Sequence, residues 1–117
     1  LVFDEVDSGV GGAVASTVGR LLQRLGRDRQ VLCVTHLPQV AACADHHLLV
    51  RKASSDVGTT STVTPITAGV RTAEIARMLG GERVSDASLA HAEEMLNSDS
   101  AASARQQPPA RHRKPRA

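Results

Sequence analysis

The sequence predicts an α/β fold in which parallel strands are flanked by helices. Two apolar runs, residues 1–3 and 31–34, each end in polar side chains, and a segment with helical apolar spacing lies between them. Uninterrupted apolar runs are typical of strands buried on both faces, the usual arrangement in parallel sheets. A strand, a helix and a second strand within roughly 35 residues form a βαβ unit, whose crossover is almost always right-handed.

Three acidic side chains, Asp4, Glu5 and Asp7, follow the first predicted strand. In open α/β sheets, ligands bind at the carboxyl ends of the strands. Adjacent carboxylates repel each other and are costly to bury, so a cation or a polarised water in front of Asp4 and Glu5 would explain the pair. On these residues alone, an ordinary acidic turn explains it equally well.

A glycine-rich loop over residues 8–12 leads into a predicted helix over residues 13–25. Five apolar side chains fall at helical spacing along it: Val14, Val18, Leu21, Leu22 and Leu25. Gly26 is a natural helix end. Arg20, Arg24 and Arg27 lie off this stripe and indicate a solvated face, with nucleic-acid binding as the alternative.

The second predicted strand covers residues 30–36 and ends in Thr35 and His36. Parallel strands present their carboxyl ends at one edge of the sheet, so we expect these two residues beside Asp4 and Glu5. A histidine at a strand end is commonly structural. A histidine at the same edge as an Asp-Glu pair favours a functional site.

The rest of the chain predicts a hairpin and three further helices. Pro38 begins a short helix within residues 37–44. Strands over residues 48–52 and 62–67 are expected to pair, with Pro65 confining the second to a sheet edge or bulge. Helices follow over residues 72–79 and 86–96, the latter with Ser85 as its N-cap.

Composition limits the possible functions. The 117 residues suffice for one small domain, and a single aromatic residue, Phe3, argues against a base-stacking platform. No apolar run is long enough to span a bilayer, and Cys33 and Cys43 predict core residues in a reducing compartment.

Residues 98–117 carry five basic side chains against one acidic one and predict a disordered tail rich in Pro, Arg and Ser. This tail is either a solvated terminus or a contact for DNA phosphates.

The motifs resemble a known family. Residues 1–7 look like the Walker B motif and D-loop of ABC-type ATPase heads, and Val34-Thr35-His36 looks like their switch histidine. The run 33–41, Cys-Val-Thr-His-Leu-Pro-Gln-Val-Ala, is narrower. With residues 3–10 and the late Ala76-Arg77-Met78-Leu79-Gly80-Gly81, it resembles the carboxyl-terminal end of the RecN family, bacterial DNA repair proteins related to SMC proteins.

The resemblance implies a fold, a set of residue roles and a set of partners. Residues 1–97 would be the C-terminal lobe of an ABC/SMC-type P-loop ATPase head, incomplete as a domain. Asp4 would hold Mg²⁺ through a water, Glu5 would orient or deprotonate the water that attacks ATP, and His36 would contact the γ-phosphate. Asp7 would reach a second head in a homodimer. The full-length protein would bind DNA and would not bind a membrane. It would be located in the bacterial cytoplasm, associated with the nucleoid.

Parts of such a nucleotide site are absent from the 117 residues. They contain no G-x-x-x-x-G-K-[ST] P-loop, no ABC signature motif and no coiled-coil heptads. Because the chain opens with Leu1 inside a strand, we expect it to be the carboxyl-terminal piece of a longer protein, inactive as an ATPase alone. The alternatives are a non-catalytic lobe that docks on a full-length head, and the head of another SMC- or ABC-type ATPase.

Overall fold

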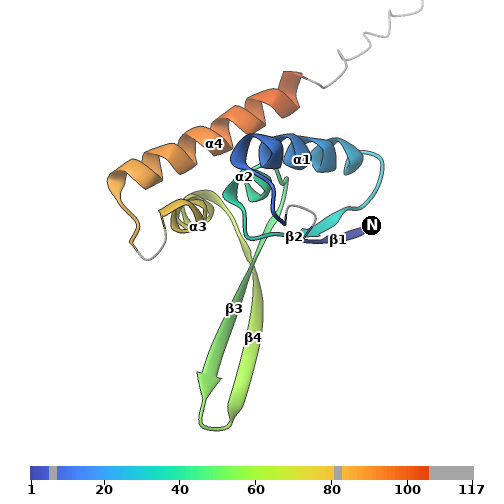
Figure 1. The fold of residues 1–117 in the computed structure, drawn as a ribbon. Helices are drawn as coiled ribbons and strands as arrows, with labels where there is room; N and C mark the ends of the chain where they lie inside the picture. Colours follow the sequence, from blue (N-terminus) through green and yellow to red (C-terminus); the bar gives the residue numbers. More distant parts are fainter. Residues whose placement is uncertain (6–7, 81–82, 106–117) are drawn as a thin grey trace, which may run out of the picture.

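The computed structural model describes residues 1–5, 8–80 and 83–105 of the chain. Its elements follow the order β1, α1, β2, α2, β3, β4, α3, α4. Figure 1 shows a body of helices beside a short parallel sheet, with α4 lying along the top and the β3–β4 hairpin projecting from the opposite side. The predicted α/β class is confirmed, with one small parallel and one small antiparallel sheet.

The predicted βαβ unit is present at the start of the chain. β1 (Val2–Asp4) pairs in parallel with β2 (Leu32–Val34), and α1 (Gly12–Leu25) connects them. In the register, Phe3 lies opposite Cys33 and Asp4 opposite Val34. α2 (Pro38–Ala41) follows β2 after a short turn and begins at the expected proline.

The expectation that β1 and β2 are buried on both faces is wrong for this chain. Val2 is 72% exposed and Val34 52% exposed, while Phe3 and Cys33 on the other face are half-buried. The sheet that contains β1 has only two strands in the described part of the chain, so helices shield one face and nothing lies over the other. The absence of polar alternation in β1 and β2 therefore does not mean that both faces of the sheet are covered by the described residues.

Close packing joins α1 to the turn after α2. Gly19 is buried, and a Cβ atom there would lie 2.8 Å from the Cys43 sulfur and 3.2 Å from the Gln39 carbonyl oxygen. Glycine at this position lets the α1 backbone approach Cys43, which is itself buried. The Cys43 thiol donates to the same Gln39 carbonyl at 3.3 Å.

The hairpin is longer than predicted. β3 (His47–Ser55) and β4 (Gly58–Ile66) form an antiparallel ladder that runs from the His47–Ile66 pair to the Ser55–Gly58 pair. Residues 53–61, which lie between the two predicted strands, therefore supply strand residues, and only positions 56 and 57 lie outside the ladder. Serine and threonine fill much of β4, and threonine suits an extended backbone because it is β-branched.

Two helices complete the body. α3 (Ala68–Gly80) and α4 (Asp86–Arg105) pack together around buried Ile75, Ala76 and Ala92, with half-buried Met78, Leu79, Leu89, Met95 and Leu96 against them. The predicted N-cap of α4 is confirmed, because the Ser88 backbone N–H donates to the Ser85 hydroxyl at 3.1 Å and the Ser85 N–H donates to the Ser88 hydroxyl at 2.8 Å. This reciprocal pair satisfies two donors at the helix start.

The end of α4 corrects one prediction. The helix continues to Arg105, so residues 98–105 are helical where the sequence predicted the start of a disordered tail. Alanine-rich residues 101–104 tolerate a helix although they add no apolar stripe. The rest of the predicted tail, residues 106–117, lies outside the described residues. None of the described helices is both long and apolar enough to cross a membrane.

Arg71 connects α3 to the end of α2. Its Nη2 donates to the carbonyl oxygens of Ala41 at 3.2 Å, Ala42 at 3.5 Å and Ala44 at 2.6 Å. Carbonyls at a helix end lack partners within the helix, and a guanidinium both satisfies them and matches their partial negative charge. A four-residue helix such as α2 has little stability of its own, so this contact helps to hold it.

Candidate functional site

The carboxyl ends of β1 and β2 meet at one edge, as the sequence predicts. Asp4 lies opposite Val34 in the parallel register, and the Glu5 backbone N–H donates to the Val34 carbonyl at 3.2 Å. Thr35 and His36 directly follow Val34. The backbone therefore brings the Asp-Glu pair and the Thr-His pair to neighbouring positions at the same edge.

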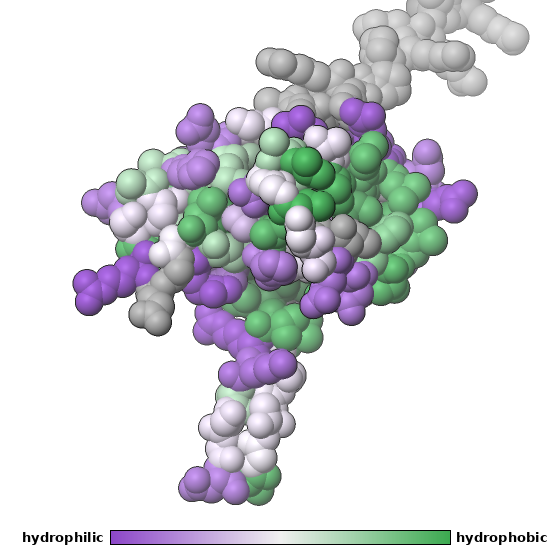
Figure 2. Space-filling view, viewed as in Figure 1, coloured by the Kyte–Doolittle hydropathy of each residue, from purple (hydrophilic) through white to green (hydrophobic). Residues whose placement is uncertain are grey.

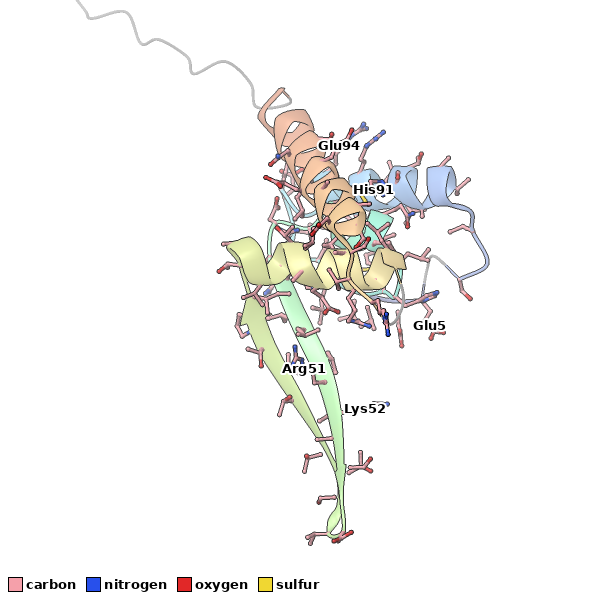
Figure 3. All side chains as sticks on the ribbon, turned by 90° about the vertical axis from the view of Figure 1, so that its left-hand side faces the viewer. Glu5, Arg51, Lys52, His91 and Glu94 are labelled. Atoms are coloured by element: carbon pink, nitrogen blue, oxygen red, sulfur yellow. The ribbon has the colours of Figure 1, made fainter. Side chains whose placement is uncertain are left out.

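Glu5 has an unusual backbone conformation. Its φ is +52°, in the left-handed region that residues other than glycine seldom adopt. A turn accompanies this conformation, because the Ser8 N–H donates to the Glu5 carbonyl at 3.1 Å. Backbone strain of this kind clusters at functional sites and costs on the order of 1–3 kcal/mol. Glu5 and Asp4 are both exposed (Figure 3 labels Glu5 at the surface), and Asp7 lies outside the described residues.

A local hydrogen bond shapes the turn that carries His36. The Leu37 backbone N–H donates to the Thr35 hydroxyl at 3.0 Å, so the half-buried Thr35 side chain closes the turn around His36. Pro38 then starts α2 at once. The His36 side chain is exposed and available to a ligand at this edge.

Gln39 is a neighbour of the site that sequence reasoning did not single out. A Cβ at Gly12, the first residue of α1, would lie 3.4 Å from the Gln39 side-chain nitrogen. The amide therefore sits beside the glycine-rich segment that follows Glu5. Its position directly after Pro38 in the Thr-His-Leu-Pro-Gln run was the available signal.

The donor set at this edge consists of two carboxylates, a hydroxyl and an imidazole. Among the residues that the structure describes, no three His, Cys, Asp or Glu side chains are grouped closely enough to hold a metal ion by themselves. Mg²⁺ commonly takes only one or two protein carboxylates and completes its shell with water and phosphate oxygens. Asp4 and Glu5 fit that kind of shared coordination, and they do not form an all-protein metal cage.

A second group of charged side chains lies at the base of the hairpin. Glu74 is 7% exposed and accepts two hydrogen bonds from Arg77, at 2.5 Å and 3.0 Å. The Arg77 hydrogen bonds hold the pKa of Glu74 below its ordinary value, and the charge of His47 acts in the same direction. Burial lowers the pKa of His47, the charge of Arg71 lowers it further, and Glu74 opposes both. This group lies on β3 and α3, away from the edge at Asp4.

A shallow hollow of about 200 Å³ lies between α1, α2 and α4. Arg20, Gln39, His91 and Glu94 are among the side chains that line it, and Figure 3 labels the last two on α4. Side chains of both charges line this hollow, so it does not favour either an anionic or a cationic ligand. The sequence did not predict it, because its walls come from three separate helices.

Comparison with known proteins agrees with the resemblance seen in the motifs. No family model matches the chain. It is 48% identical over 96 residues to the DNA repair protein RecN of Vibrio cholerae, 46% to that of Bacillus subtilis and 53% to that of Mycobacterium tuberculosis. These matches cover 82% of the chain and 16–17% of each relative, so the chain spans about a sixth of the length of the curated relatives it matches.

Fold and edge together define an α/β protein built on a βαβ unit with acidic residues and a histidine at its carboxyl edge. Within that class, the identity of 46–54% over more than four-fifths of the chain shows that the chain belongs to the RecN family.

Proposed function

We propose that this chain contributes the Walker B, D-loop and switch-histidine edge of an ATPase head that acts in DNA double-strand break repair and recombination. The similarity to proteins named DNA repair protein RecN supports the biological role. The observation that carries the chemistry is the β1–β2 register, which puts Asp4 and Glu5 next to Thr35 and His36.

Each side chain has a role that its chemistry suits. Asp4 would hold Mg²⁺ through a water, Glu5 would position or deprotonate the attacking water, and His36 would contact the terminal phosphate. Bound Mg²⁺ and ATP supply the electrophilic phosphoryl group and the neutralising charge. Asp7, in the D-loop, would contact a second head across the nucleotide.

Further chain is needed to complete this site. No lysine-bearing phosphate loop occurs in the 117 residues, so the chain alone is expected to bind ATP weakly and not to turn it over. The exposed face of β1 and β2, with Val2 and Val34 uncovered, supports the same proposal, because apolar strand faces are ordinarily covered. A lobe outside these 117 residues would cover that face and supply the phosphate loop.

A chimera tests the assignment. Residues 1–97 replace the corresponding segment of Mycobacterium tuberculosis RecN, to which the chain is 53% identical. ATP hydrolysis and ATP binding are then measured for the chimera, for Glu5→Gln and for Glu93→Gln, an exposed glutamate on α4 that serves as the matched control. Loss of a general base predicts hydrolysis slower by roughly 100-fold or more for Glu5→Gln, with ATP binding retained.

The control is expected to hydrolyse ATP at the rate of the unmodified chimera. Asp4→Asn is expected to weaken Mg²⁺-dependent ATP binding, which separates cation handling from water activation. Full hydrolysis by the Glu5→Gln chimera would remove Glu5 from the mechanism. Sustained hydrolysis by the purified 117-residue chain would show that the site does not need further chain.

A further inference from the structure

The β3–β4 hairpin extends away from the body and has exposed side chains along most of its length. Every residue from Arg51 to Pro65 is exposed, and Figure 1 shows the ribbon projecting from the helices without another element beside it. Nine residues per strand make it about 30 Å long. A two-stranded ribbon with no cover is only marginally stable in water, so a projecting one is favoured where it meets a partner.

The outer part of this hairpin is polar and carries more positive than negative charge. Seven hydroxyl side chains lie on it: Ser54, Ser55, Thr59, Thr60, Ser61, Thr62 and Thr64. Two cations, Arg51 and Lys52, accompany a single acid, Asp56, at the tip. Figure 2 shows this ribbon as mostly pale, with hydrophilic residues at its upper part and its tip.

The two cations lie on opposite faces of the ribbon. Arg51 pairs with Thr62 and Lys52 with Ser61, and successive strand residues point to opposite faces. Figure 3 labels both on β3, where the Lys52 side chain projects away from the ribbon. They lie three and four positions before Ser55 in the final pair of the ladder, which is about 10–14 Å along the strand.

These dimensions match a groove of duplex DNA. The major groove is about 12 Å wide and about 8.5 Å deep and admits a two-stranded β-ribbon. With the tip in the groove, the two cations stand at its rim, one facing the phosphates of each strand. Val57, 97% exposed at the tip, is placed to contact a thymine methyl group, and the hydroxyls can bind phosphate and base-edge atoms.

We propose that the β3–β4 hairpin inserts tip first into a groove of duplex DNA, with Arg51 and Lys52 binding phosphates on the two strands. A duplex is favoured over a single strand because the hairpin has no aromatic side chain on which unpaired bases could stack. The surface is separate from the edge at Asp4 and Glu5, and its binding requires no nucleotide. Failure of the proposed ATPase role would therefore leave it standing.

Fluorescence anisotropy with a short blunt-ended duplex, without ATP, tests the proposal on the full 117-residue chain. The test variant is Arg51→Gln/Lys52→Gln. The matched control is Arg29→Gln/Arg83→Gln, which removes the same charge from exposed positions outside the hairpin. The tail arginines are the same in both, so their attraction for DNA cancels in the comparison.

Two lost phosphate contacts are expected to weaken binding roughly tenfold or more at about 100 mM salt and to reduce the slope of log K against log salt by about 1.8. The control is expected to change affinity by less than about a third of that loss. The charge-preserving Arg51→Lys/Lys52→Arg is expected to bind nearly as the original chain does. Asp56→Asn is expected to bind more tightly, because it removes the one negative charge near the groove.

Circular dichroism establishes that the exposed substitutions leave the fold intact. Equal losses in the hairpin and control variants would reduce the effect to net charge and overturn the proposal. No measurable affinity of the chain for duplex DNA at low salt would also overturn it. Equal affinity for the single strand of the same sequence, with the same loss in the hairpin variant, would refute insertion into a groove.

Discussion

Replacing Gly19 with alanine is expected to destabilise the chain, against the usual preference of helices. Alanine in a helix interior is favoured over glycine by about 1 kcal/mol. At Gly19 the added Cβ would lie 2.8 Å from the Cys43 sulfur, 3.1 Å from its Cβ and 3.2 Å from the Gln39 carbonyl oxygen. Two of these neighbours are buried side-chain atoms and the third is backbone, so none can yield without moving α2.

The magnitude follows from two opposing effects. Forcing an additional carbon into a packed interior typically costs about 1–3 kcal/mol. The gain in helix propensity offsets about 1 kcal/mol of this cost. We therefore expect Gly19→Ala to lower the free energy of unfolding by about 1 kcal/mol. Urea denaturation followed by circular dichroism measures this change.

Gly69 provides a matched control on a different helix. It is the second residue of α3, and a Cβ there would meet no atom within 4 Å. Gly69→Ala should therefore raise the free energy of unfolding, by up to about 1 kcal/mol. The same substitution is expected to have opposite signs at the two positions.

A double-mutant cycle separates the contact from other effects. Cys43→Ala removes the sulfur that lies nearest to the added Cβ, so Gly19→Ala should cost less in that background. If Gly19→Ala stabilises the chain as much as Gly69→Ala does, the close packing of α1 on Cys43 is wrong. If its cost is the same with and without the sulfur, the contact does not explain it.

Two further substitutions test other parts of the fold. His47 has a pKa below its ordinary value of 6.5, mainly because of burial. In the unfolded chain this imidazole binds a proton at a higher pH than in the folded chain. Its contribution to the free energy of unfolding is therefore complete above about pH 6.5 and is lost as the pH falls through the lowered pKa. The difference in unfolding free energy between the chain and His47→Gln should accordingly shrink as the pH is lowered below about 6.5 in urea titrations, and a constant difference would contradict the burial of this imidazole. Ser85→Ala should lower the free energy of unfolding by about 1 kcal/mol in the same assay, because the α4 cap is lost. Ser98→Ala, at an exposed position within α4, should not lower it. Equal effects of the two substitutions would exclude capping as the cause.

The elements that the sequence predicted well depend on local pattern. The apolar stripe from Val14 to Leu25 fixes a helical period, and Pro38 and Ser85 mark helix starts through their own backbone chemistry. The shared edge of Asp4 and His36 followed from the rule that a strand, a helix and a strand make parallel pairs. In each of these cases the residue types of a short segment are sufficient to predict the local structure.

The predictions that failed depend on what packs against an element. Val2 and Val34 have the character of buried residues, yet burial requires a covering layer that these residues do not themselves specify. The length of β3 and β4 was missed because serine, threonine and glycine suit both loops and extended ribbons. The continuation of α4 past Leu96 lacks an apolar stripe, so no periodic signal announced it.

A contact distant in sequence supports the short helix that follows the turn at His36. α2 is too short to persist alone, and the guanidinium that holds its carbonyl end belongs to Arg71, about 30 residues further along the chain. The carbonyl end of α2 is therefore capped only where the β3–β4 hairpin has returned the chain and α3 lies against it. The edge that carries Asp4, Glu5 and His36 is thus connected, through α2, to a helix from the second half of the chain.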